Sequence, residues 1–389
     1  MTDILLTGVT GSLGKVLAQQ LAKRGHKIHC LIRAPNKAAA EQRLREAIGD
    51  IRNVHAFRGD VTQENCGVNE QDPAIEIANI STIVHAAAMV DFFNAEGTWR
   101  TNVEGTENVL KLAERLGVER FIYVSTAYVI GAADRLDEQT PAEELTAATN
   151  TPYEQSKRAA EKLVRAWSKR TGTPVTIVRP SIITGRADGS MPEEKRRAFY
   201  EYVDALRKAR NAAVHLSQHE VGSGFITEAG RVRSSVPLGI LMSADARLNL
   251  VPIDWCAEMI THLVEVSHPG VEIVHLTDSA PLRTRDILAW TLDEVSLDNV
   301  QTVETPAELD KLKASQRGHG KIRVVQRTLE GILKSFKVYT NHAPVFETVN
   351  TRRLLGNHHY PPQVDETYIR RTLRVTGISI RPEKPLAAE

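Results

Sequence analysis

The feature that most constrains the fold is a glycine-rich stretch near the start of the chain, TGVTGSLGK, in which Gly8, Gly11 and Gly14 recur every third residue. The apolar run ILL precedes it and a helix-like run follows it. A strand that leads through such a turn into a helix presents backbone N–H groups at the positive end of the helix dipole, where anions bind. Glycine permits a positive φ and lets the backbone approach a pyrophosphate. The spacing differs from the common G-x-G-x-x-G, so a plain packing turn stays open.

Short runs rich in valine and isoleucine alternate with longer segments of helical spacing in the first half of the chain. Strands are predicted at Ile4–Thr7, Lys27–Arg33, Val54–Arg58, Thr82–His85, Phe121–Ser125 and Val175–Arg179. Helices are predicted at Ser12–Arg24, Ala38–Ile48, Thr98–Leu116 and Pro152–Thr171. This alternation predicts an α/β fold of the Rossmann type, in which a doubly wound parallel sheet is buried on both faces.

The rhythm changes after Gly185. The sequence predicts a charged helix, a loop-rich region, an amphipathic helix and a strand, at Pro192–Arg210, Gly222–Ser243, Asp254–Val266 and Glu272–Leu276. From about Leu282 we expect helices joined by long polar linkers, and a frayed tail at Arg381–Glu389. The corresponding domains are a nucleotide-binding domain, 1–185 with 250–278 returning to it, and a smaller mixed substrate-binding region, 186–249 and 279–389.

The charge and composition of the chain argue against several classes of protein. A net charge of +1 gives no electrostatic case for nucleic acid. The three cysteines, Cys30, Cys66 and Cys256, are odd in number and far apart, which argues against disulfides and zinc and suits a reducing cytoplasm. We expect no metal site: His215 and His219 lack acidic or cysteine partners at a convincing spacing and are interpreted as structural. No signal peptide or membrane span is predicted, although peripheral membrane contact stays open.

The second predicted strand indicates which nucleotide binds. A cofactor with a free 2′-hydroxyl usually meets an acidic residue at the end of this strand, but here the strand ends on Arg33. A guanidinium at this place pairs with a 2′-phosphate, which favours NADP over NAD. Lys37 is a weaker candidate for contact with the same phosphate. The alternative is that Arg33 is a surface arginine that merely ends the strand. After the third strand, Asp60 is placed to accept from an adenine amine.

Tyr153 and Lys157, in PYEQSK, lie four residues apart and therefore share one face of the predicted helix. A nearby ammonium is expected to lower the pKa of the phenol and to make Tyr153 a proton donor and acceptor near neutral pH. The lysine can also hold the nicotinamide ribose. At the end of the fifth strand, Thr126, or Ser125 as second choice, offers a hydroxyl that would hydrogen-bond the substrate carbonyl.

Together, these motifs resemble those of an extended short-chain dehydrogenase/reductase. The stretches TGVTGSLG, GDV, VHAAA, TNVEGTENVL, VSTAYV, YEQSK and RPSIITG match that family's motifs in order and cover about residues 1–185, and VPIDW extends the match. LIRA, GDVTQENCGV, HAAAMVDF and STAYV are similar to the carboxyl-reducing branch, which holds fatty acyl-CoA reductases (the "male sterility" group) and thioester reductase domains. Glu220–Arg247 and Leu282–Glu389 follow no pattern of that branch.

The resemblance implies that Thr126, Tyr153 and Lys157 are catalytic. It also implies that a set of residues touches or shapes the NADP(H) site: Gly8, Thr10, Gly11, Ser12, Leu13, Gly14, Arg33, Asp60, Val61, Ala86, Ala87, Asn102, Pro180, Ser181 and Ile182. Asn102 is expected to be partly structural, holding the loop after the fourth strand.

The first functional hypothesis is NADPH-dependent reduction of an acyl thioester to an aldehyde, and in a second round to an alcohol. The thioester would arrive as a CoA ester or on a separate carrier protein. The alternatives are an extended reductase of a ketone or secondary alcohol, with a hydroxysteroid-like or sugar-nucleotide substrate, and a non-catalytic NADP-binding protein. The basic residues of MPEEKRRAFYEYVDALRKAR fit a CoA phosphate or an acidic carrier, but a solvated mixed-charge face is the simpler interpretation. Phe92, Phe93, Trp99, Phe225 and Met242 are candidate pocket walls.

Overall fold

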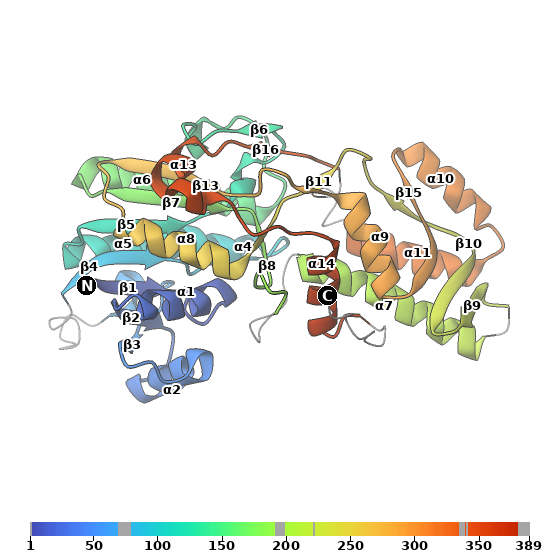
Figure 1. Cartoon of the computed structure of the whole chain (residues 1–389), viewed down its shortest axis with the longest axis horizontal. Coiled ribbons are helices and arrows are strands. Elements are labelled where there is room, and N and C mark those ends of the chain that lie inside the picture. Colours follow the sequence, from blue (N-terminus) through green and yellow to red (C-terminus); the bar gives the residue numbers. More distant parts are fainter. Residues whose placement is uncertain are drawn as a thin grey trace. The chain divides into compact units, whose positions relative to one another are not determined.

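The computed structural model describes residues 2–68, 79–190, 199–220, 222–333, 339 and 341–379 of the chain. They form two compact units, which are described separately (Figure 1). The first contains residues 1–184, 251–279 and 344–362, and the second contains residues 185–250, 280–343 and 363–389. The segment 344–362 therefore belongs to the first unit, whereas the sequence analysis placed it with the substrate-binding region.

The first unit is built on a seven-stranded sheet in the order β13-β7-β5-β4-β1-β2-β3. Each strand runs parallel to its neighbours. The strands are β1 Asp3–Thr7, β2 Lys27–Ile32, β3 Val54–Arg58, β4 Ile80–His85, β5 Arg120–Val124, β7 Val175–Pro180 and β13 Val271–Leu276. The helices are α1 Ser12–Lys23, α2 Lys37–Ile48, α4 Ala95–Trp99, α5 Gly105–Leu116, α6 Pro152–Thr171, α8 Ile253–Glu265 and α13 Val349–Leu355. The predicted α/β fold of the Rossmann type is confirmed.

Helices cover both faces of this sheet (Figure 1). Successive side chains of a strand point to opposite faces. Ile4 and Leu6 accordingly join a core with residues of α1, α2 and α8, and Leu5 joins a second core with residues of α5 and α6. Because both faces are covered, the strands are almost uniformly apolar, and this is the pattern that identified them in the sequence. The carboxyl ends of the strands form one edge, where ligands of such sheets bind.

The second unit contains a three-stranded sheet in the order β15-β10-β9. Its strands are β9 Phe225–Glu228, β10 Arg231–Leu241 and β15 Leu297–Val303, and β11 Arg247–Leu248 pairs with β14 Leu282–Arg283. Its helices are α7 Phe199–His219, α9 Thr284–Glu294, α10 Pro306–Ser315, α11 Gly320–Leu333 and α14 Glu366–Val375. Residues 192–198 of the predicted charged helix and the predicted tail lie outside the described residues.

The prediction of a loop-rich region over Gly222–Ser243 was wrong, because β9 and β10 form a hairpin there. Its turn places Ala229 and Gly230 at φ of +47° and +78°, the left-handed pair that two-residue hairpin turns require. Along the first residues of β10, buried and exposed positions alternate. Val232 and Ser234 are buried and alternate with Arg231 and Arg233. Charged residues at alternating positions make such a half-buried strand hard to recognise in the sequence. The expectation of long polar linkers after Leu282 was also wrong, since α9, α10, α11, α13, α14 and β15 occupy most of the described residues of that stretch.

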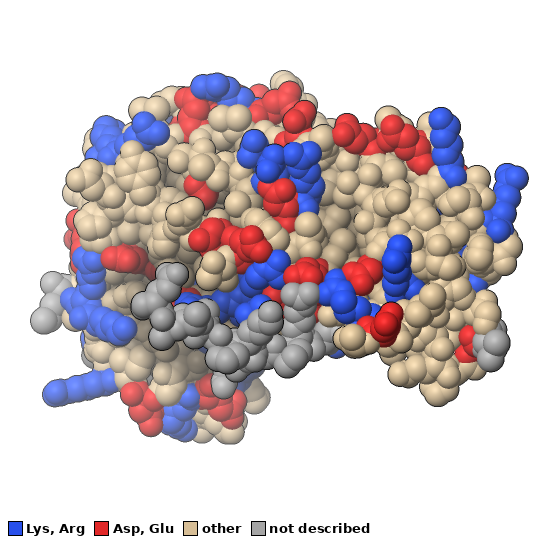
Figure 2. Space-filling model, turned by 45° about the vertical axis from the view of Figure 1, so that its right-hand side comes forward, with Lys and Arg blue, Asp and Glu red and all other residues tan. Residues whose placement is uncertain are grey.

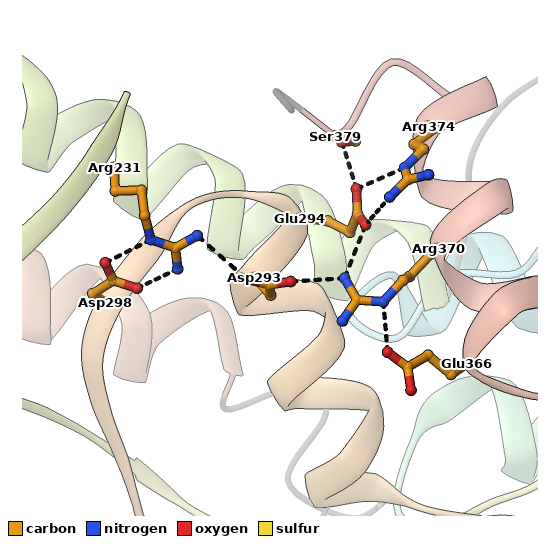
Figure 3. A network of polar contacts seen from close by, with 8 residues as sticks. All are labelled: Arg231, Asp293, Glu294, Asp298, Glu366, Arg370, Arg374 and Ser379. Atoms are coloured by element: carbon orange, nitrogen blue, oxygen red, sulfur yellow. Dashed lines mark hydrogen bonds and ion pairs between the residues drawn. The ribbon is translucent and has the colours of Figure 1, made fainter. Parts of the chain in front are cut away.

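A network of ion pairs connects α9, β10, β15 and α14 within the second unit (Figure 3). Arg231 donates two hydrogen bonds to Asp298 and one to Asp293, the latter at 3.2 Å. The fully buried Glu294 accepts from Arg370 at 2.9 Å, from Arg374 at 2.8 Å and from Ser379 at 2.7 Å. The network therefore fixes α14 and the residues that follow it onto the end of α9.

The described surface carries both signs of charge. On the face shown in Figure 2, basic and acidic side chains are interspersed rather than gathered by sign. Among the described residues, no helix has the length and apolar character needed to cross a bilayer, and no group of three or more His, Cys, Asp or Glu is placed to hold a metal ion.

Candidate active site

The glycine turn joins β1 to α1, and its three glycines have different surroundings. Gly8 has φ +82°, and a Cβ there would lie 2.6 Å from the backbone nitrogen of Ala87. A Cβ at Gly14 would lie 2.1 Å from the carbonyl oxygen of Gly8. Gly11 is exposed, and a Cβ there would meet only the Gly8 oxygen, at 3.3 Å. Gly8 and Gly14 are thus required by the close packing of the chain itself, whereas the space beside the Cα of Gly11 is nearly unoccupied by the chain.

Arg33 follows β2 and is exposed, as is Lys37 at the start of α2. Two further arginines, which the sequence analysis missed, lie against the same backbone. Arg43 of α2 donates to the carbonyl oxygen of Arg33, and Nε of Arg58, the last residue of β3, donates to that of Ala34 at 3.2 Å. Because β2 and β3 are adjacent, their ends carry one basic cluster of Arg33, Arg43 and Arg58. The alignment of Ile32 with Arg58 follows from strand order, which spacing alone does not give.

Asp60 follows β3, but its carboxylate forms hydrogen bonds within the turn that contains it. Oδ1 accepts from the backbone nitrogen of Thr62 at 3.0 Å and from the Thr62 hydroxyl at 2.9 Å. The carbonyl oxygen of Val61 accepts from the Asn108 side chain at 3.0 Å, which ties this loop to α5.

Asn102 holds the loop that follows β4. Its amide oxygen accepts from the Met89 nitrogen at 2.8 Å, and its nitrogen donates to the Met89 oxygen at 3.0 Å and to the Ser156 hydroxyl at 2.9 Å. Asn102 lies in a π-helical turn, Arg100–Glu104, between α4 and α5. Such turns insert one residue into a helix and often occur at functional sites. The predicted single helix over Thr98–Leu116 is therefore interrupted at the turn that contains Asn102.

Tyr153 and Lys157 lie in the first turns of α6. The Thr151 hydroxyl caps this helix by accepting from the Glu154 nitrogen at 3.2 Å, and Pro152 occupies its first position. Lys157 is buried; its ammonium donates to the carbonyl oxygen of Val124 at 2.8 Å and to the Tyr123 hydroxyl at 3.4 Å. The ring of Tyr153 faces that of Phe92, with 6.5 Å between the ring centroids.

The expected depression of the Tyr153 pKa is absent from this structure. Desolvation raises the pKa of Tyr153 above the ordinary value, with a smaller contribution from the Glu154 charge. Desolvation also lowers the pKa of Lys157 to about 7, against the Glu161 charge, which raises it. The Lys157 ammonium donates to two residues of β5, so burial outweighs any stabilisation of a Tyr153 phenolate.

Thr126 and Ser125 follow β5 and have different partners. Thr126 begins the 3₁₀ turn Ala127–Ile130, and its Oγ1 accepts from the Tyr128 nitrogen at 3.2 Å. Because the oxygen accepts there, the Thr126 hydroxyl keeps its proton for another acceptor. Ser125 Oγ is buried without a hydrogen-bond partner among the described residues, as is Ser181 Oγ after the neighbouring strand β7. Buried hydroxyls without partners are uncommon and point to groups that a ligand satisfies.

The predicted pocket walls fall in both units. In the first unit, Phe93 is 78% exposed and Trp99 42% exposed, and Phe92 contacts Tyr153. In the second unit, Phe225 and Met242 are buried in the core, so the structure gives them a packing role. The rings of His215 and His219, two residues of α7, lie near each other with 4.6 Å between their centroids.

Comparison with known proteins places this site in a family. Residues 6–260, about two thirds of the chain, match the family described as male sterility protein. The chain belongs to that family. It is therefore an extended short-chain dehydrogenase/reductase with a NAD(P)-binding domain, as the sequence motifs predicted. The match includes the glycine turn, Thr126, Tyr153 and Lys157.

The known proteins that are similar to this chain fall into two groups. A 3-beta-hydroxysteroid dehydrogenase of Mycolicibacterium neoaurum is 32% identical over 242 residues, which cover 58% of this chain and 60% of that protein. An isonitrile lipopeptide synthase of Streptomyces coeruleorubidus is 28% identical over 304 residues, 74% of this chain and 18% of the synthase. Among solved structures, the terminal R domain from the myxalamid PKS-NRPS biosynthetic pathway superposes with a TM-score of 0.73 at 25% identity, over 98% of this chain and 93% of that domain.

Proposed function

We propose that this protein is an NADPH-dependent reductase that converts an acyl thioester, presented as a CoA ester or on a separate carrier protein, to an aldehyde. The likeness to the myxalamid R domain carries this proposal, because it extends over 98% of the chain and so includes the second unit. The match to the hydroxysteroid dehydrogenase covers only 58%. Substrate choice in such folds depends on the parts added to the dinucleotide-binding sheet.

The residues at the carboxyl edge of the sheet fit a dinucleotide. Gly11 leaves space beside its Cα at the start of α1, where a pyrophosphate is favoured. The cluster of Arg33, Arg43 and Arg58 supplies guanidinium groups for a 2′-phosphate, and this feature favours NADP over NAD. The unpartnered hydroxyls of Ser125 and Ser181 lie at the ends of β5 and β7 on the same edge. The remaining residues carried over from the resemblance lie in the loops that follow β1 and β4 or at the ends of elements beside this edge: Thr10, Ser12, Leu13, Ala86, Pro180 and Ile182.

When bound, NADPH supplies a hydride for the carbonyl carbon. The chain's own residues handle the carbonyl oxygen and the cofactor ribose. Thr126 donates a hydrogen bond to the developing oxyanion, and Tyr153 donates its proton to that oxygen. The raised pKa of Tyr153 keeps the phenol protonated over the whole neutral range, as a proton donor must be. Lys157 holds the ribose with the one N–H that Val124 and Tyr123 leave free.

The test is NADPH oxidation over a panel of acyl-CoAs, acyl carrier proteins, aldehydes, ketones and steroids. Thioester turnover releases one thiol per NADPH, which a thiol reagent detects. The protein itself contributes little to that signal, because Cys30, Cys66 and Cys256 are buried and burial raises the pKa of each thiol. Turnover of ketones without any thioester would refute the proposal. Thr126→Val should lower kcat about 100-fold or more, and Ser125→Ala serves as its neighbouring comparison.

Tyr153→Phe is the sharpest variant for the chemistry. It removes the proton donor but keeps the ring that faces Phe92. We expect kcat to fall at least about 100-fold while the NADPH Kd changes little. Equal turnover in the variant and the parent protein would show that Tyr153 is not the proton donor.

A second function deserves testing because two hydroxysteroid dehydrogenases are 31–32% identical to this chain over 242 residues. In that case the same Thr126, Tyr153 and Lys157 would interconvert a secondary alcohol and a ketone. The thiol readout separates the two functions, because only thioester reduction releases a thiol.

A further inference from the structure

A row of buried polar side chains runs beneath the catalytic pair, from Lys157 to the glycine turn. The Tyr123 hydroxyl contacts Lys157 Nζ at 3.4 Å and hydrogen-bonds with Thr106. Thr106 Oγ1 lies 3.1 Å from Nε2 of His85, and Nδ1 of His85 lies 2.7 Å from Thr7 Oγ1. Thr7, Thr106 and Tyr123 are all fully buried, and His85 nearly so.

Counting donors and acceptors fixes the direction of each bond in this row. Thr106 donates its single proton to the carbonyl oxygen of Asn102, at 2.6 Å, so its oxygen accepts from its other two partners. His85 must therefore donate from Nε2, and its Nδ1 accepts from Thr7. Burial lowers the pKa of His85 to about 3, so the ring is neutral and carries only that one proton. The Thr7 oxygen in turn accepts from the Ala87 nitrogen at 3.1 Å.

The same counting leaves Tyr123 with one role toward Lys157. An ammonium carries only donors, so the Tyr123 oxygen can act toward Lys157 only as an acceptor. The ammonium also lies 4.8 Å from the centroid of the Tyr123 ring. Val124 and Tyr123 together occupy two of the three ammonium protons, which leaves the third for another acceptor. The direction of that third N–H is set by the other two bonds.

We propose that Tyr123 is a positioning residue for the reaction: its hydroxyl, held as an acceptor by Thr106 and His85, keeps the Lys157 ammonium charged and aims its free proton at the cofactor ribose. This inference rests on the proposed function in one respect, that Lys157 binds the cofactor. Nothing in the motif spacing points to Tyr123, which reads in the sequence as an apolar residue of a buried strand.

The charged and titratable groups around Lys157 come from four elements. Tyr153 and Glu161 lie on α6 itself, Tyr123 on β5 and His85 on β4. Arg179 of β7 faces Glu161 and forms an ion pair with it. Glu161 favours the ammonium from one turn away, and burial opposes it. The Tyr123 hydroxyl is a side-chain hydrogen-bond acceptor of Lys157, so its removal should act directly on the lysine.

The experiment measures the NADPH Kd from pH 5.5 to 9 for the parent protein and four variants. They are Tyr123→Phe, Thr106→Val, Lys157→Met and the control Thr261→Val. Thr261 in α8 matches Thr106, because it is buried and its hydroxyl donates to the oxygen four residues earlier, of Ala257, at 2.8 Å. The 2′-phosphate of NADPH titrates with every variant, so the difference from Lys157→Met isolates the lysine.

We expect the parent protein to lose NADPH affinity as Lys157 loses its proton, in a step that Lys157→Met lacks. Tyr123→Phe should move the midpoint of this step to lower pH by about one unit, because an acceptor of the charged form is lost. Thr106→Val, which frees the Tyr123 hydroxyl to turn, should move it in the same direction by less, and Thr261→Val should leave it in place. Thr106→Val carries the test if Tyr123→Phe fails to fold.

Two results would overturn the inference: a Tyr123→Phe profile that superimposes on that of the parent protein, or a step that survives in Lys157→Met. Neither depends on finding the substrate. A panel without thioester turnover, together with the expected shifts in NADPH affinity, would refute the proposed reaction and leave the role of Tyr123 intact.

Discussion

Glu161 lies one helical turn after Lys157 and forms a fully buried, two-pronged ion pair with Arg179. Arg179 Nε donates to Glu161 Oε1 at 3.0 Å and Nη2 donates to Oε2 at 2.7 Å, and neither side chain is exposed. The pair joins α6 to β7, so it holds the helix that carries Tyr153 and Lys157 against the sheet. The same carboxylate favours the charged form of Lys157.

Removing one member of this pair should be far more harmful than removing both. Glu161→Gln leaves the Arg179 charge buried without its counterion and should lower the free energy of unfolding by about 3–5 kcal/mol. The double variant Glu161→Leu with Arg179→Met should regain most of that loss, because two charges no longer need to be desolvated. Urea unfolding of the three proteins measures this. Additive losses in the double variant would contradict the description of the pair as coupled.

The glycines of the turn should separate into two classes. Gly14→Ala places a Cβ 2.1 Å from the Gly8 oxygen, so α1 must move; we expect a loss of about 3 kcal/mol or failure to fold. Gly11→Ala meets only one atom, at 3.3 Å, and should unfold at nearly the parent urea concentration. Its NADPH Kd should nevertheless rise about tenfold or more, because the methyl group occupies the pyrophosphate approach. A stable Gly11→Ala protein with unchanged NADPH affinity would argue against a phosphate-binding role for Gly11.

The first unit could be predicted from the sequence because its two covered faces make its strands apolar and its helices amphipathic. The glycine turn, Arg33, Thr126 and the Tyr153–Lys157 pair all stand at the ends or starts of such elements, where their spacing shows. Arg58 could not be found in this way, since it joins Arg33 through the pairing of β2 with β3, and neither could Arg43, which contacts the Arg33 backbone from α2. The same is true of Tyr123, whose partners come from three other elements.

The second unit was harder to predict because polar residues, rather than apolar ones, specify much of it. β10 alternates arginines with buried residues, and Glu294 is a carboxylate buried among arginines from a helix about 75 residues away. Sequence patterns treat such charges as solvated surface. The pKa of Tyr153 was mispredicted for a related reason: helical spacing brings Lys157 near, but only the structure shows that its ammonium is directed toward β5.

Arg33 should govern the choice between NADPH and NADH. Arg33→Ala should raise the NADPH Kd by about 10- to 100-fold, as expected for the loss of a charge-assisted contact, and change the NADH Kd little. Arg43→Ala should have a smaller effect of the same kind, since Arg43 holds the Arg33 backbone. Arg45→Ala, also exposed on α2, is the control and should leave both constants unchanged. Equal losses of NADPH and NADH affinity in Arg33→Ala would refute contact with the 2′-phosphate.

Lys157 should impose a pH dependence on the stability of the cofactor-free protein. Its folded-state pKa of about 7 lies below the ordinary value, so between about pH 7 and 10 the unfolded chain binds more protons. Stability from this residue therefore rises with pH across that window. Relative to Lys157→Met, the parent protein should gain about 2–3 kcal/mol between pH 6 and 9. Urea unfolding at the two pH values measures the difference, and a constant difference would show that Lys157 keeps an ordinary pKa.

Glu294 should make the second unit sensitive to acid. Burial by itself raises the pKa of this carboxyl, but the hydrogen bonds from Arg374, Ser379 and Arg370 outweigh it and hold the pKa below the ordinary value. A carboxyl with a lowered folded pKa stabilises the protein above its unfolded value, and this stability is lost as pH falls through the folded pKa. Glu294→Gln keeps the shape but not the charge and should cost about 3 kcal/mol at pH 7. Its deficit relative to the parent protein should shrink below about pH 4, where the parent carboxyl takes up a proton. Urea unfolding at pH 7 and at acid pH measures both effects, with Asp286→Asn, a half-buried carboxylate of the same helix, as control. An equal deficit at the two pH values would mean that the arginines recognise the shape of the Glu294 side chain rather than its charge.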